Sequence, residues 1–230
     1  MTISVERFLE VRPVLYHYTS PEGVERLRHL GLWCTKDILR RYGVAEEQVR
    51  EWTTFPRFDS IPLDHPDYGP TRISHQKPML TQTGKVHGKL LESLAMTNTS
   101  VEQFCTMLAE RVFFFGIPHD WRYEKRDANG FVGRVLLDGP LCQVVISTTK
   151  LLKLCEAQGV QFEVSKHNAG SFPQGPALPK GRGTWMSLDQ AGFAVGQVQE
   201  VVVVGSVDCL GDVIEDVVEV KPPPAKTAAR

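Results

Sequence analysis

Short hydrophobic runs separated by polar or glycine- and proline-rich stretches predict a chain built largely from short strands. The strongest run spans 200–204, where four valines follow Glu200. A run without polar positions is typical of a strand buried on both faces, and the aromatic run at 112–116 has the same character. The pattern predicts strands at 14–19, 112–116, 141–147, 160–164, 184–188, 200–204 and 217–220, the last of them pairing at the edge of 200–204.

Helix signals are concentrated in the first half of the chain. Ser20 and Pro21 form an N-cap followed by proline at the first helical position, and Gly31 ends that helix. Ser100 and Gln103 match a capping box. The pattern predicts helices at 21–30, 35–42, 45–52, 85–94, 101–110 and 150–157. Because helices dominate early and strands late, without regular β-α-β alternation, the predicted fold class is α+β.

Two irregular stretches interrupt this pattern. The first, 53–78, contains five prolines together with large side chains such as Phe55 and Ile73. Loops of this length are usually functional, so we expect an ordered loop over a pocket. The second, 165–183, is rich in glycine and proline. We expect residues 1–221 to form a single domain and residues 222–230, which begin with three prolines, to form a disordered tail.

Composition narrows the class of protein. The 230 residues are 42% hydrophobic, which excludes wholesale disorder, and no apolar run is long enough to span a bilayer. The N-terminal residues lack the apolar stretch of a signal peptide. A net charge of −1 is unlike that of proteins that hold duplex nucleic acid mainly by phosphate contacts. Five widely spaced cysteines favour buried thiols in a reduced, cytoplasmic protein.

Common cofactor motifs are missing from the sequence. It has neither a G-x-G-x-x-G after a predicted strand nor a P-loop, so the usual glycine-rich phosphate cradles are absent. Histidines that lie next to aspartates have no third ligand nearby, and we expect no metal site.

Three side chains at strand ends are candidates for chemistry. Alternation along the first strand puts His17 and Thr19 on one face, near the point where the strand ends. A core histidine beside helix-capping residues is the alternative interpretation of this pair. Glu200 begins the valine strand, where its neighbours would hold a carboxylate rigidly for electrostatic or acid–base work. The alternative for Glu200 is an ordinary exposed charge at a strand end.

Further candidates come from the aromatic strand and the irregular stretches. Phe113 and Phe115 are candidates for the floor of a pocket, and packing in the core is the alternative for both. Arg72, Gln76 and Lys77, in the long proline-containing loop, are candidates for a phosphate or amide contact. Asn168, Gly170 and Arg182, in the second irregular stretch, are candidates of the same kind. A solvated loop is the alternative for both groups.

The order of these segments resembles that of the ADP-ribosyltransferase superfamily, in particular its DNA-modifying toxin (DarT-like) branch. The segment 15–19, a short helix and then Gly31 and Leu32 resemble the opening of these enzymes, where a histidine or asparagine precedes a hydroxyl residue. The strand at 112–115 is similar to their second motif, and 199–207 to their catalytic strand. The chain also resembles an uncharacterised bacterial family with the same opening. The loop at 53–78 has no clear counterpart in the toxins.

The resemblance implies a split antiparallel sheet with flanking helices around a cleft for NAD, which is the substrate. It implies that Glu200 is catalytic and that His17 acts with it while also holding the ribose. Thr19 would help His17 to fix the sugar relative to Glu200. NAD binding would further involve the following residues: Phe113 or Phe115 stacked on nicotinamide, Arg72 at the pyrophosphate, and Asn168.

The expected function is NAD-dependent mono-ADP-ribosyl transfer to a macromolecule. A nucleic-acid base is one candidate acceptor, protein is another, and an antitoxin is a candidate partner. Two alternatives keep the same site: an NAD glycohydrolase, with water as acceptor, and a non-catalytic module that binds NAD or another nucleotide. We also expect His17 and Glu200, which are far apart in the sequence, to face each other across one cleft, roughly 6–12 Å apart. Thr19 and Phe113 or Phe115 should line the concavity between them.

Overall fold

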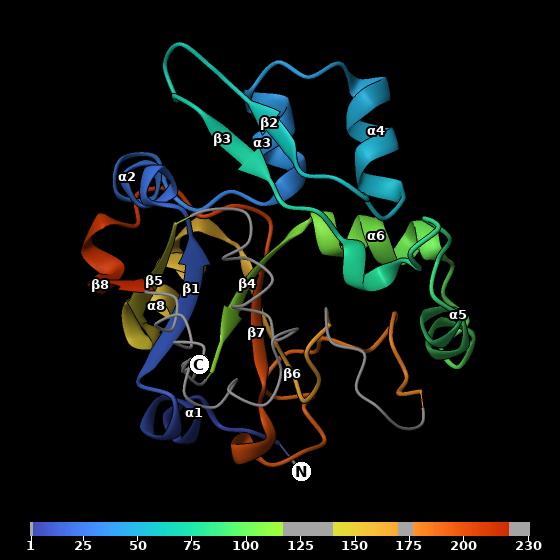
Figure 1. Cartoon of the computed structure of the whole chain (residues 1–230). Helices are drawn as coiled ribbons and strands as arrows, with labels where there is room; N and C mark the ends of the chain where they lie inside the picture. Colours follow the sequence, from blue (N-terminus) through green and yellow to red (C-terminus); the bar gives the residue numbers. More distant parts are fainter. Residues whose placement is uncertain (1, 117–139, 170–176, 221–230) are drawn as a thin grey trace, which may run out of the picture.

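The computed structural model describes residues 2–116, 140–169 and 177–220 (Figure 1). The predicted disordered tail at 222–230 therefore lies outside the described residues, as does part of the stretch 165–183. The described residues form a mixed α+β structure, as predicted from the order of helix and strand signals. In the described part of the chain, no helix is both long enough and apolar enough to cross a membrane.

The centre of the structure is an antiparallel sheet with six strands in the described residues (Figure 1). Its spatial order is β6-β7-β4-β1-β5-β8. The bounds are β1 Val14–Thr19, β4 Arg111–Phe115, β5 Leu141–Ser147, β6 Gln161–Ser165, β7 Glu200–Val204 and β8 Ile214–Val220. The predictions of strands at five of these places are confirmed, and β8 begins earlier than predicted.

Two strand predictions need correction. The segment 184–188 forms no strand, because only Met186 pairs, in an isolated bridge with Val164. The segment 217–220 was expected beside β7, but it belongs to β8, which pairs with β5 at the opposite edge of the sheet. The position beside β7 is not available, since β6 and β4 already flank that strand.

Short helices flank the sheet. They are α1 Val5–Val11, α2 Pro21–His29, α3 Thr35–Arg41, α4 Glu46–Thr54, α5 Gly88–Ala95, α6 Val101–Ala109 and α8 Thr148–Gln158, with 3-10 turns η1 Lys77–Met79, η3 Val195–Gln197 and η4 Gly211–Val213. The caps predicted at Ser20 and Ser100 are confirmed: the Ser20 hydroxyl accepts from the Gly23 amide, and Ser100 and Gln103 form a capping box. Thr35, expected to cap the next helix, is instead its first residue, and the N-cap Cys34 makes no side-chain hydrogen bond. The helix α1 was not predicted from the sequence.

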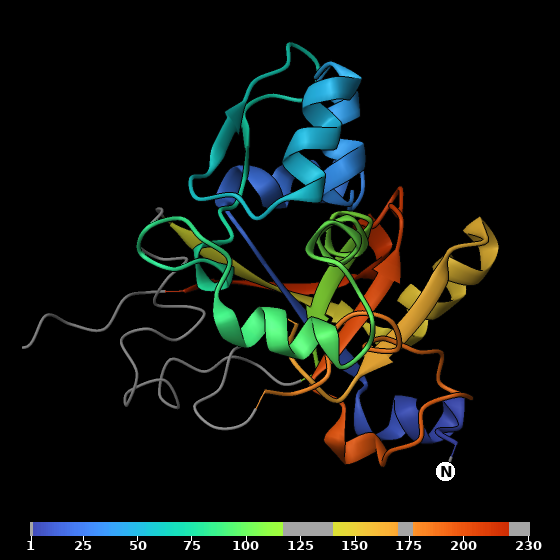
Figure 2. The same ribbon diagram turned by 90° about the vertical axis from the view of Figure 1, so that its right-hand side faces the viewer.

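Both faces of the sheet are covered, and the valines of β7 divide between them. Val201 and Val203 belong to a cluster that packs against α1, α2 and α8. Val202 points to the other face and packs with Phe104 of α6 and Leu90 of α5. Figure 2 shows α8 on one side of the sheet and α5 and α6 on the other. This burial on two faces explains why β7 lacks polar residues after Glu200.

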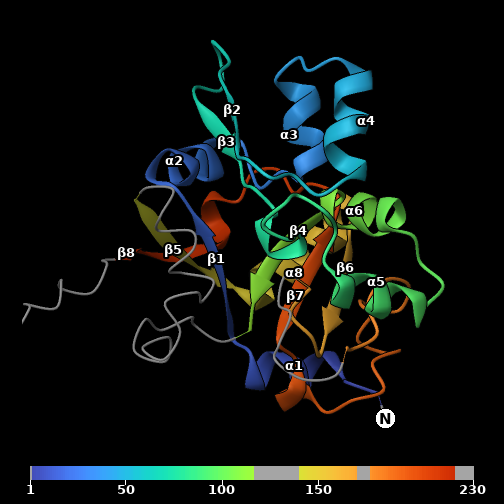
Figure 3. The same cartoon turned by 45° about the vertical axis from the view of Figure 1, so that its right-hand side comes forward.

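A smaller unit lies beyond one end of the sheet (Figure 3). It contains α3, α4 and a hairpin of β2 Ile61–Leu63 and β3 Thr71–Ile73, packed around a separate cluster that includes Trp33, Leu39 and Tyr42. The hairpin lies within the stretch predicted to be an ordered loop. Its strands are three residues long and β2 contains Pro62, so the sequence has no strand signal there.

The central pair of the sheet, β1 and β4, is the least regular. In the described chain, the two strands are paired at one position only, Tyr16 with Phe115, whereas β1 pairs with β5 along its whole length. On the other side of β4, pairing with β7 is also complete, from Arg111 to Phe115. Beyond Tyr16 the two halves of the sheet therefore separate.

Gly31 allows the chain after α2 to approach the segment that follows β7 closely, which gives a test of the fold. Its φ is +112°, and a Cβ there would lie 2.3 Å from the Val207 carbonyl oxygen, which accepts from the Leu32 amide. Gly31→Ala should lower the free energy of unfolding by about 2–4 kcal/mol in urea titrations. Gly43→Ala is the matched control: φ is +73° and no described atom lies within 4 Å, so only about 1 kcal/mol should be lost. Equal losses would contradict this account.

Candidate functional site

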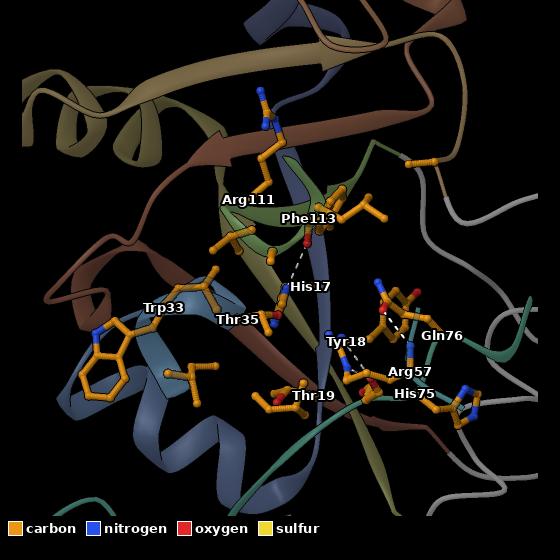
Figure 4. A pocket seen from close by; sticks show the side chains of 18 of the residues that line it. His17, Tyr18, Thr19, Trp33, Thr35, Arg57, His75, Gln76, Arg111 and Phe113 are labelled. Carbon is orange, nitrogen blue, oxygen red and sulfur yellow. Dashed lines mark hydrogen bonds between the residues drawn. The ribbon is translucent and has the colours of Figure 1, made fainter. Parts of the chain in front are cut away.

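A cavity of about 390 Å³ lies where β1 and β4 separate, which is a size typical of small-molecule sites. Its wall combines the end of β1, the start of β4, the beginning of β7 and residues of the proline-containing segment 53–78. Figure 4 shows many of these side chains around the space. It is lined by every residue to which the resemblance assigns a role: His17, Thr19, Arg72, Phe113, Phe115, Asn168 and Glu200. Of the other loop candidates, Gln76 lines it, Lys77 and Arg182 do not, and Gly170 lies outside the described residues.

Glu200 is held at the first position of β7, between Ser165 of β6 and Phe115 of β4. Its side chain is 3% exposed, so the alternative interpretation as an exposed charge at a strand end is wrong. The carboxylate accepts a hydrogen bond from the Trp185 indole Nε1 at 2.9 Å. It also accepts from the Ala169 amide, at 3.3 and 3.4 Å to its two oxygens. Glu200 is thus oriented by two donors from outside its own strand.

The environment of Glu200 shifts its titration toward neutral pH. Burial raises the pKa of the Glu200 carboxyl to about 7, because a buried negative charge loses its hydration. The donors Trp185 and Ala169, and the charge of Lys180, lower the pKa but do not offset burial. A carboxyl with a pKa near 7 has both its ionised and its protonated form available at neutral pH.

Lys180 holds the segment that contacts Glu200, and it was not among the candidates from the sequence. Its side chain is 2% exposed, and its ammonium donates to the carbonyls of Ala169 at 2.7 Å and Asn168 at 3.2 Å. Burial lowers the pKa of Lys180 to about 8, although the charge of Glu200 raises it. Lys180 thereby fixes the segment whose amide contacts Glu200. A lysine in a glycine- and proline-rich stretch has no sequence signal that distinguishes it from a solvated one.

His17 reaches the cavity through the gap between the strands. Alternation places His17 on the face of Leu15, and Glu200 on the face of Val202, so the two do not project from one face of the sheet. The imidazole Nδ1 lies 3.0 Å from the Phe113 carbonyl oxygen (Figure 4). Since a carbonyl only accepts, Nδ1 donates and the neutral ring leaves Nε2 as an acceptor. Burial lowers the pKa of His17, opposed by the Phe113 contact and reinforced by Arg26, which favours that neutral form.

The two aromatic candidates differ in accessibility. Phe115 is buried and packs edge-on against Tyr18, with ring centroids 5.7 Å apart. Phe113 is half-buried and lies with its ring edge-on to Trp185 at 6.0 Å. Both line the cavity, but Phe113 has more ring surface free for a ligand. Thr19 packs tightly on α2, where a Cβ added at Gly23 would lie 2.0 Å from its hydroxyl oxygen.

Positive charge dominates the wall of the cavity. In the described residues, the arginines that line it are Arg26, Arg57, Arg72 and Arg111, and the single lining carboxylate is Glu200. Such an excess of positive side chains attracts an anionic ligand. Of these arginines, only Arg72 was a candidate from the sequence. Arg26 lies in a helix, Arg57 follows a proline and Arg111 lies in a strand, and no local signal distinguishes them from ordinary surface arginines.

Comparison with protein families matches residues 13–214 to the model of a family of unknown function (DUF7002). Neither the curated proteins nor the solved structures contain a match. The matched range includes β1, β4 and β7, the strands that line the cavity, and every candidate residue.

The raised pKa of Glu200 predicts a pH-dependent stability. A carboxyl whose folded pKa lies above its unfolded value stabilises the fold below about pH 4.5, and this contribution is lost as pH rises through about 7. Relative to Glu200→Gln, the wild type should therefore lose on the order of 2–3 kcal/mol of unfolding free energy between pH 4.5 and pH 8. Urea titrations at several pH values measure the difference. The exposed Glu156→Gln on α8 should follow the wild type, and a pH-independent difference for Glu200→Gln would contradict burial of its charge.

Proposed function

The chain belongs to the DUF7002 family, a family of unknown function, and from the geometry of its cavity we propose that it is an NAD-dependent mono-ADP-ribosyltransferase acting on a macromolecular acceptor. The observation that carries this proposal is the cavity at the separation of β1 and β4, which brings a neutral histidine, a buried glutamate and an accessible aromatic ring into one wall. We further propose that the antiparallel sheet is a split sheet of the ADP-ribosyltransferase type.

Glu200 supplies the electrostatic element of the reaction. Transfer breaks the bond between the ribose C1′ and the nicotinamide nitrogen, and nicotinamide leaves as a neutral molecule while positive charge develops on the sugar. An ionised Glu200 that accepts a hydrogen bond from the neighbouring ribose hydroxyl stabilises this charge, as carboxylates do in glycoside hydrolysis. A pKa near 7 also suits Glu200 to take the proton that the acceptor loses when it attacks C1′.

His17 and Phe113 position the sugar and the leaving group. The Phe113 carbonyl holds the imidazole, so Nε2 is presented as a fixed acceptor for a ribose hydroxyl. The half-buried Phe113 ring stacks on nicotinamide in this proposal, and Trp185 at its edge restricts its movement. Because Trp185 also donates to Glu200, the carboxylate and the Phe113 ring are held in fixed positions relative to each other.

The class of macromolecule that accepts the ADP-ribosyl group is the remaining part of the proposal. The lining arginines are accounted for by the phosphates of NAD, so they do not by themselves select a nucleic acid over a protein. Incubation of the protein with labelled NAD and separate pools of protein, DNA and RNA identifies the acceptor. Label in a macromolecule supports transfer, nicotinamide release without such label supports an NAD glycohydrolase, and binding without release supports a non-catalytic module.

Glu200→Gln should reduce nicotinamide release about 10²- to 10³-fold while NAD still binds, because glutamine keeps the shape of the side chain but offers no negative charge. In the wild type, release should increase as pH rises through about 7, where Glu200 ionises. Chromatographic measurement of nicotinamide over a pH series tests both points. The control is Glu156→Gln, exposed on α8 and outside the cavity. Equal release by folded wild type and folded Glu200→Gln would exclude the assigned role.

A further inference from the structure

One lining arginine, Arg57, has its guanidinium fixed by backbone carbonyls. Arg57 follows α4 and is half-buried in the wall of the cavity. Its guanidinium donates to backbone carbonyls, that of Trp52 at 2.5 Å and that of Ser74 at 3.3 Å from both Nε and a terminal nitrogen. Among the described residues, no carboxylate forms an ion pair with Arg57. Buried charges in proteins are normally paired, so an anionic ligand would supply the partner that the described residues do not provide.

The other three arginines are engaged differently. Arg111 is paired with Glu163, at 3.0 Å from the carboxylate, and stacks over the Trp185 ring. Arg26 donates to the Thr71 hydroxyl of the hairpin. Arg72 is exposed on β3, where water screens its charge. Neither Arg26 nor Arg57 forms an ion pair with a described carboxylate, but Arg57 has its guanidinium fixed at three N–H groups by backbone carbonyls, whereas Arg26 donates to a single hydroxyl.

The surroundings of Arg57 keep it charged and fixed. Burial lowers its pKa to about 10, which still leaves the guanidinium protonated at neutral pH. The one described group whose ionisation would offset it is the Cys105 thiol, but burial raises the pKa of that thiol to about 12, so it stays neutral. The backbone of Arg57 is tied to Gln76, since the Gln76 amide donates to its carbonyl at 2.7 Å and its own amide donates to the Gln76 side chain.

We infer that Arg57 is the main ligand of a diphosphate group of a nucleotide bound in the cavity. A guanidinium has five N–H donors, of which three are used by the carbonyls, so two remain, one on each terminal nitrogen. Two donors on one rigid plane suit the oxygens of a phosphate. In Figure 4, Arg57 lies beside Gln76 and His75, on the opposite side of the view from Trp33 and Thr35. That the ligand is a nucleotide rests on the proposed function. The main phosphate contact is then Arg57, whereas the sequence favoured Arg72.

The test compares two probes that differ only in phosphate: ADP and adenosine. In calorimetric titrations the wild type should bind ADP more tightly than adenosine. Arg57→Gln should bind ADP about 10- to 100-fold more weakly and adenosine equally well, because charge-assisted hydrogen bonds of this kind are worth one to two factors of ten. Arg57→Lys keeps the charge but not the planar pair of donors, and it should fall between the two. Arg50→Gln, an exposed arginine of α4 outside the cavity, is the matched control.

The outcomes separate this inference from the proposed function. Folded Arg57→Gln or Arg57→Lys that binds ADP as the wild type does would overturn the inference, and so would a wild type that binds ADP no better than adenosine. Arg57→Gln loses contacts with Trp52 and Ser74. If it does not fold for that reason, the comparison of ADP binding between Arg57→Lys and the wild type tests the inference. Failure of the proposed function would appear instead as a wild type that binds ADP through Arg57 but releases no nicotinamide from NAD.

Discussion

The site depends on one interruption of backbone pairing in the middle of the sheet. β1 and β4 pair at Tyr16 and Phe115 and then separate, and the His17 ring takes the Phe113 carbonyl that a continued ladder would give to a backbone amide. A continuous sheet would leave no space between these strands. The complete pairing of β1 with β5, and of β4 with β7, keeps each half rigid on its side of the gap. The cavity is therefore a consequence of strand geometry, and its width is set by rigid elements.

The apolar core that stabilises the sheet makes the charge of Glu200 energetically unfavourable. The carboxylate lies beside Val202 and the α5–α6 cluster, and among the described residues only Trp185, Ala169 and Lys180 compensate for its burial. A hydrophobic residue at this place would suit the core better than a carboxylate whose pKa is near 7. Lys180 is costly for the same reason. Both buried charges lower the stability of the fold, and perturbed groups of this kind are typical of functional sites.

Much of the secondary structure could be predicted from the sequence, because local signals determine it. The Ser20 and Ser100 caps, Gly31 and the valines of β7 each act within a few residues. The hairpin was missed because its strands are short, and the place of 217–220 because strand order depends on contacts between distant segments. The candidate residues at strand ends all reach one cavity, but Arg57 and Lys180 were not found, since burial of a charged side chain in a loop is decided by tertiary packing alone.

The position of Trp185 has an optical consequence. Its indole donates to the Glu200 carboxylate, has the Arg111 guanidinium 4.8 Å from its ring centre and touches the edge of Phe113. Charges this close to an indole shift its emission, and a protonated carboxyl quenches it more strongly than an ionised one. Trp185 is one of four tryptophans, so the difference in emission between the wild type and Trp185→Phe reports protonation of the carboxyl and stacking of a ligand without an added label.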